Sequence, residues 1–107
     1  MSMTASQAAA ELQPYREQLD QINELLVDLL AERMAICRVI ARVKSARGIP
    51  MMQPARVSSA LDQVRGLSAS RQLRGEYLDD LFQLIIAETC AEELRLMARL
   101  AAPPGEG

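Results

Sequence analysis

A single long helical segment near the N-terminus constrains this chain more than any other feature. Residues 12–47 are dominated by Ala, Leu, Glu, Arg and Gln, and no glycine occurs before Gly48. Apolar residues recur through the segment at helical spacing, at Leu19, Ile22, Leu26, Leu29, Ile36 and Ile40. At 1.5 Å per residue the helix would be about 54 Å long, which is more than the rest of the chain can cover. The stripe therefore predicts a homodimer in which the long helix of each subunit spans both halves.

The remainder of the chain predicts two further helices and no sheet. Proline and glycine positions bound them at about residues 54–66 and 75–100, and no segment alternates apolar and polar residues with a period of two. We therefore predict an all-α fold with three helices in each subunit. The helical domain is expected to cover residues 12–101, with residues 1–11 and 102–107 disordered.

Composition excludes several classes of function. Of the 107 residues, 12 are basic and 14 acidic, a net charge of −2, which argues against nucleic acid or an anionic membrane as partner. The chain has no histidine and two cysteines, which excludes a structural zinc site and histidine-dependent nucleophilic catalysis. No apolar run approaches the roughly 18 residues of a membrane span. We expect a cytoplasmic protein without a metal or other cofactor.

Two cations lie on the apolar face of the long helix. At 100° per residue, Arg33 and Lys44 fall within the arc of the apolar stripe. A buried cation is costly without a partner, and this stripe supplies no acid. Either carboxylates from elsewhere in the chain pair with these cations, or an anionic ligand reaches them in a cavity between helices.

The third helix also has polar residues on its apolar side. Thr89 lies on its apolar face, and Glu93 follows one turn later, so a hydroxyl and a carboxyl would face the same cavity. The alternative is that Glu93 lies at the solvated edge of the helix.

Arg56, in the first turn of the second helix, would add a cation. Arg16 lies off the apolar arc, but in a dimer of crossing helices it would reach the cavity of the other subunit.

This constellation resembles the all-helical chorismate mutases. The resemblance lies in the order and spacing of Arg16, Arg33, Lys44, Arg56, Thr89 and Glu93, and in the amino-acid sequences of residues 30–33 and 81–86. It covers residues 12–97 and implies an intertwined dimer with two shared active sites. The implied reaction is a [3,3] rearrangement of a small dicarboxylate, which needs no cofactor. The protein holds a chair-like conformer and stabilises charge that develops on the ether oxygen.

The resemblance also implies roles for individual residues. Arg16 of the partner subunit and Arg33 would bind carboxylates, and Arg56 would support the ligand. Lys44 would donate to the ether oxygen and to a carboxylate. Thr89 stands where the family often has serine.

Three positions depart from the usual pattern of that family. Glu93 stands where glutamine is common, and a carboxylate must be protonated to donate a hydrogen bond, or else serve another purpose. Val57 stands where glutamate is common, and Gln53 stands where aspartate is common. The side of the pocket that faces the C4 substituent therefore differs from that of most family members.

Three short segments are similar in sequence to the 4-amino-4-deoxychorismate mutases of antibiotic biosynthesis, namely residues 49–54, 56–57 and 88–90. This favours conversion of 4-amino-4-deoxychorismate to 4-amino-4-deoxyprephenate. The alternatives are a mutase that converts chorismate to prephenate, an isochorismate-pyruvate lyase, and a non-catalytic helical dimer. The lyases share the valine at position 57 but retain glutamine at position 93, which counts against a lyase.

Overall fold

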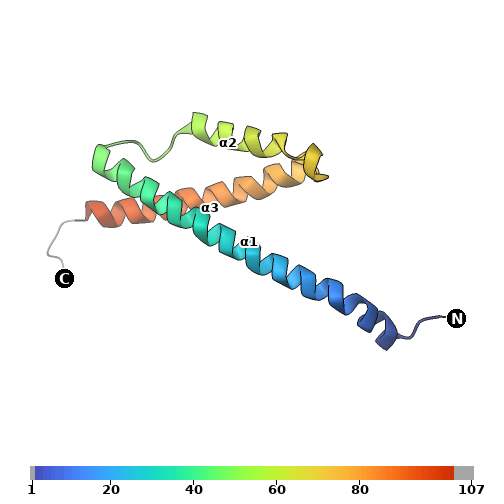
Figure 1. Ribbon diagram of the computed structural model, residues 1–107. Coiled ribbons are helices and arrows are strands. Elements are labelled where there is room, and N and C mark those ends of the chain that lie inside the picture. Colours follow the sequence, from blue (N-terminus) through green and yellow to red (C-terminus); the bar gives the residue numbers. More distant parts are fainter. Residues whose placement is uncertain (1, 103–107) are drawn as a thin grey trace. The chain divides into compact units, whose positions relative to one another are not determined.

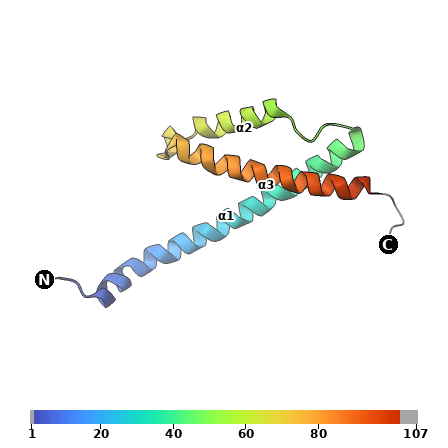
Figure 2. The same ribbon diagram turned by 180° about the vertical axis from the view of Figure 1, so that it is seen from behind.

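The computed structural model describes residues 2–102, and these residues are helical almost throughout (Figures 1 and 2). The chain forms α1 (Ala5–Arg47), α2 (Pro54–Gly66), the short 3₁₀ helix η1 (Ala69–Arg71) and α3 (Gly75–Ala101), with no strand among the described residues. The predicted all-α fold, with three α-helices and a very long first one, is confirmed.

Helix α1 begins earlier than the sequence analysis predicted. Its start is marked by a reciprocal pair of hydrogen bonds. The Thr4 N–H donates to Gln7 Oε1 at 2.8 Å, and the Gln7 N–H donates to Thr4 Oγ1 at 3.2 Å. This capping box satisfies two backbone donors at the helix start. The predicted start at Leu12 is therefore wrong, and residues 5–11, expected to be disordered, are helical.

The other helix bounds agree with the prediction. Helix α1 ends at Arg47, α2 covers the predicted residues, and α3 extends one residue beyond the predicted end. Pro54 occupies the first turn of α2, where its missing N–H costs no hydrogen bond. Helix η1 was not predicted. Residues 103–107 of the predicted disordered tail lie outside the described residues, and the domain bounds at residues 12–101 remain a prediction.

A glycine ends α1 and starts the loop to α2. Gly48 has a φ of +65°, in the left-handed region, and the Ile49 N–H donates to the Lys44 carbonyl at 2.9 Å. This arrangement is the Schellman motif, in which a left-handed residue lets the chain turn back onto the last helical turn. A Cβ at Gly48 would meet no atom within 4 Å, so the backbone conformation alone requires glycine there.

The chain divides into two compact units, residues 1–35 and residues 36–107. In the second unit α2 and α3 run antiparallel, side by side (Figures 1 and 2). An ion pair joins them where Arg65 Nη2 lies 2.6 Å from Asp79 Oδ1. This unit also contains the last three turns of α1, and it holds all the buried residues among those described, namely Ala41, Leu78, Thr89, Glu93 and Leu96.

The apolar stripe of α1 is solvent-exposed in the single chain. Its members in the first unit, Leu19, Ile22, Leu26 and Leu29, are 51–59% exposed. Exposed apolar surface of this kind marks an interaction site. The homodimer inferred from this stripe remains a prediction.

None of the helices within residues 2–102 combines the length and hydropathy needed to cross a membrane.

Candidate functional site

A buried ion pair joins the end of α1 to α3. Lys44 Nζ lies 3.1 Å from Glu93 Oε1, and it also donates to the Met51 carbonyl at 2.8 Å. The Lys44 side chain is 12% exposed and that of Glu93 8%. An ammonium group has three donors, so these two acceptors leave one N–H available for a ligand. The carboxylate that neutralises Lys44 therefore comes from the chain itself, which was one of the two alternatives for the cations of the stripe.

Helix periodicity on both sides brings the two charges together. Ala41, one turn before Lys44 on α1, is fully buried. On α3 the buried residues Thr89, Glu93 and Leu96 follow each other at helical spacing on one face. Glu93 is thus a buried residue, and the alternative that it lies at a solvated helix edge is wrong.

Thr89 lies one turn before Glu93 on the same face of α3. Its hydroxyl donates to the Ile85 carbonyl at 2.9 Å, and the residue is 6% exposed. A threonine hydroxyl that donates back along its helix is held in a fixed orientation.

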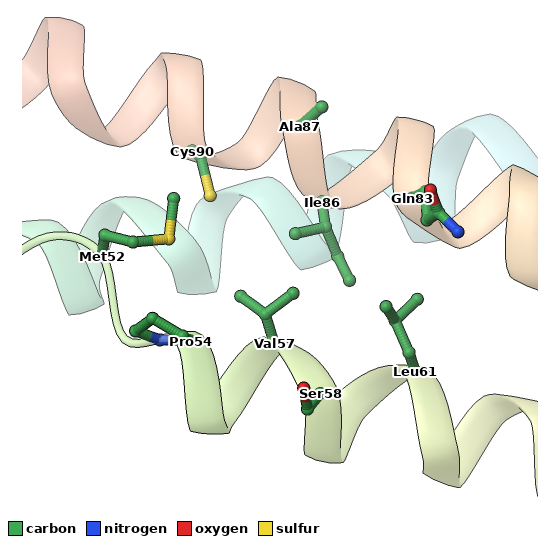
Figure 3. A pocket seen from close by; sticks show the side chains of 9 residues that line it. All are labelled: Met52, Pro54, Val57, Ser58, Leu61, Gln83, Ile86, Ala87 and Cys90. Carbon is green, nitrogen blue, oxygen red and sulfur yellow. The ribbon is translucent and has the colours of Figure 1, made fainter.

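A mostly apolar pocket lies between α2 and α3 (Figure 3). Its volume is about 470 Å³, within the range of small-molecule sites. Val57 and Leu61 of α2 point towards Ile86 of α3, and Met52 and Cys90 lie together at one end (Figure 3). The full lining comprises Met52, Pro54, Val57, Ser58, Leu61, Gln83, Ile86, Ala87 and Cys90. None of these side chains is charged.

The start of α2 contributes unequally to this pocket. Val57 lines it, whereas Gln53 and Arg56 are solvent-exposed. The Gln53 carbonyl accepts hydrogen bonds from the N–H groups of Arg56 and Val57, but its side chain makes no cap hydrogen bond. The structure therefore brings Lys44, Glu93 and Thr89 into the interior and leaves Arg56 and Gln53 at the surface.

The two remaining predicted residues belong to the unit of residues 1–35. Arg16 is exposed there and Arg33 is partly buried. Their roles in binding carboxylates remain predictions.

A surface network of ion pairs lies beside the buried pair. Glu92 is within ion-pair distance of Arg38 on α1, at 3.8 Å, and of Arg95 and Arg99 on α3, at 3.2 and 3.7 Å. The hydrogen bond from Arg95 lowers the pKa of Glu92, and the charges of Arg95, Arg38 and Arg99 lower it further against the opposing effect of desolvation. The network helps to hold α3 against the last turns of α1.

The backbone contribution to this site was not predicted from the sequence. The Met51 carbonyl binds Lys44, but any residue supplies a carbonyl, so no side-chain pattern identifies it. The apolar pocket residues other than Val57 were also missed, because they resemble ordinary helix-packing positions. Within residues 2–102, no three His, Cys, Asp or Glu side chains form a group that could hold a metal ion.

Comparison with known proteins gives consistent matches. Residues 15–94 match the family described as chorismate mutase type II. A 4-amino-4-deoxychorismate mutase of Streptomyces venezuelae is 39% identical over 83% of this chain and 86% of its own length. A protein of the same name from Streptomyces pristinaespiralis is 32% identical over 90% of this chain and 74% of its own length. A chorismate mutase of Methanocaldococcus jannaschii is 28% identical over 71% of this chain and 77% of its own length.

Proposed function

The chain belongs to the chorismate mutase type II family and is an isomerase of that type, and we propose that its substrate is 4-amino-4-deoxychorismate. The reaction is a [3,3] rearrangement to 4-amino-4-deoxyprephenate. The ether C–O bond breaks while a C–C bond forms within the same molecule. No atom is lost or gained, and no cofactor takes part.

The observation that carries this choice of substrate is the likeness to two relatives of the same name. Both are called 4-amino-4-deoxychorismate mutase, and this chain spans most of each of them. We infer a role in antibiotic biosynthesis, in the cytoplasm.

In the proposed site, charge is distributed to fit a dicarboxylate with an ether oxygen. The third N–H of Lys44 donates towards the ether oxygen, where negative charge grows as the C–O bond breaks. Thr89 and the pocket residue Val57 bound the ligand from α3 and α2. Because the catalyst acts by holding one conformer and stabilising developing charge, no nucleophile is required.

The remaining cations bind the carboxylates in a homodimer. Arg33 binds one carboxylate, and Arg16 of the partner subunit binds the other. Arg56 supports the ligand from α2, and Gln53 lies towards the C4 substituent. Dimerisation covers the exposed apolar stripe of α1, so each shared site forms only when two chains associate.

The second candidate substrate is chorismate itself, which would give prephenate. The specific observation in its favour is the match to the Methanocaldococcus jannaschii relative, which is named simply chorismate mutase.

A parallel assay of three substrates tests the proposal. Purified protein is given 4-amino-4-deoxychorismate, chorismate and isochorismate, and kcat/KM is measured for each. We expect the highest value for the amino substrate. A higher value for chorismate would replace the proposed substrate, and release of pyruvate from isochorismate would indicate a lyase. A Lys44→Gln variant, purified in the same way, measures any activity contributed by a mutase of the expression host.

A further inference from the structure

The internal ion pair at Lys44 has a consequence for any anion that approaches it. Two of the three ammonium protons of Lys44 are taken by the Met51 carbonyl and the Glu93 carboxylate. Both side chains are largely removed from solvent, and the pair carries no net charge. A ligand oxygen that accepts a hydrogen bond from the third N–H therefore binds a cation whose charge is already neutralised.

The same ligand oxygen also meets the negative charge of Glu93. Glu93 Oε1 lies 3.1 Å from the Nζ atom that the ligand would bind, so the ligand oxygen comes close to the carboxylate. Like charges repel more strongly in a partly desolvated site than in water. A dicarboxylate with two negative charges is penalised by Glu93, whereas one that also carries an ammonium group is penalised less.

We propose that Glu93 is a specificity-determining residue, a built-in counter-ion of Lys44 that favours dicarboxylates carrying an ammonium group over those that carry a hydroxyl. The inference rests on the proposed function for its ligand class. It needs no contact between Glu93 and the ammonium group, because the difference lies in net charge and acts through the whole cavity.

Other acids do not account for such selection. Glu92, the neighbouring acid on α3, is engaged by three surface arginines. Glu88 is paired with Arg95, and its side chain is 63% exposed. Among the described residues, Glu93 is the acid that is buried against Lys44.

A kinetic experiment compares wild type with Glu93→Gln, an isosteric change that removes the charge. The control is Glu88→Gln, which removes the same charge from an exposed site on the same helix. For each protein the ratio of kcat/KM for 4-amino-4-deoxychorismate to that for chorismate is measured. We expect Glu93→Gln to lower this ratio about tenfold, through a gain for chorismate. The ratio should not change in Glu88→Gln.

A binding experiment uses L-aspartate and L-malate, which differ only by an ammonium and a hydroxyl group. Their dissociation constants are measured by thermal shift, because a ligand that binds only the folded state stabilises it. Wild type should bind aspartate more tightly than malate, and Glu93→Gln should bind the two about equally. This arm is decisive if Glu93→Gln turns over neither substrate.

The outcomes separate the inference from the proposed function. If wild type prefers chorismate or turns over neither substrate, the proposed function fails, and the aspartate-to-malate ratio still tests the role of Glu93. If both ratios are the same in wild type and Glu93→Gln, the role of Glu93 is wrong while the function stands. If wild type turns over neither substrate and binds neither probe, both fail.

Discussion

The ammonium group of Lys44 at the end of α1 lies 3.1 Å from the carboxylate of Glu93 on α3, so a buried ion pair joins two helices across 49 positions of sequence. Breaking such a pair leaves a charge without compensation in the interior, whereas removing both charges together does not. The pair therefore couples the stability of the fold to the electrostatics of the site.

The first prediction concerns stability. Lys44→Met and Glu93→Leu should each lower the free energy of unfolding by about 3 kcal/mol, because each leaves the other charge buried and unpaired. Lys44→Met combined with Glu93→Leu should cost far less than the two single changes together. Urea denaturation of the single and double variants measures this coupling. Additive effects would contradict a buried pair.

The second prediction concerns turnover. Lys44→Gln should lower kcat at least about 100-fold, because the donor acts on charge that develops only in the transition state. Lys44→Arg should also be poor, since a planar guanidinium does not replace a compact ammonium. The matched control is Arg47→Gln, which removes a charge from an exposed residue in the same helical turn. Near-normal kcat in Lys44→Gln would remove Lys44 from the mechanism.

The third prediction concerns the sharing of sites between subunits. Arg16→Ala and Arg33→Ala should each be inactive as homodimers, but a mixture that has exchanged subunits should regain activity. One site of the mixed dimer then has both arginines, and the other has neither. Activity is measured after mixing, with exchange followed by mass spectrometry. Exchange without recovery would mean that Arg16 does not act across the interface.

The fourth prediction concerns the turn after α1. Gly48→Ala should destabilise the protein by about 1–2 kcal/mol, the cost of holding a side chain in the left-handed region. Gly66→Ala is the control, because Gly66 has no positive φ and an added Cβ there meets nothing within 4 Å. Thermal unfolding of both variants checks the difference. Equal stabilities would mean that the left-handed turn at Gly48 relaxes without cost.

The fifth prediction concerns acid stability. The pKa of Glu92 is lowered from 4.5 by Arg95 and its neighbours, so its ionised form stabilises the fold. That contribution is fully present above pH 4.5 and is lost as the pH falls through the lower pKa of the folded state. Glu92→Gln should flatten the decline of Tm with pH over this acid range. The effect should weaken at high salt, because the surrounding ion pairs are exposed.

The matched control for the acid range is Glu32→Gln, an exposed glutamate in the unit of residues 1–35. It should follow the wild-type profile of Tm against pH. A Glu92→Gln profile with the wild-type slope would contradict the stabilising role of the arginines around Glu92.

Much of the fold follows from local sequence signals. Gly48 and Pro54 mark the end of α1 and the start of α2, and both act through backbone constraints that need no tertiary information. The early start of α1 was also readable in principle, since Thr4 and Gln7 have capping-box spacing. Helix η1 was not, because a turn of 3 residues has too little periodicity to detect.

The site is predictable to a smaller extent. Periodicity alone indicated that Lys44 and Thr89 face inwards, but it could not decide whether Glu93 is buried, because that depends on how closely α3 packs against α1. Nor could it identify the Met51 carbonyl, which is positioned by the turn at Gly48 rather than by a side chain. Pairings between distant segments require the fold itself.

Because Lys44 belongs to a buried ion pair, directed evolution for stability conflicts with the retention of catalysis. Apolar replacements of a buried ion pair are often neutral or stabilising by about 1–4 kcal/mol. A screen that rewards heat resistance alone would therefore drift towards chains in which Lys44 and Glu93 are lost together. Such proteins would fold well and, in the proposed function, would catalyse nothing. A laboratory lineage of this enzyme can become more robust without losing its chemistry only if turnover is selected at every round.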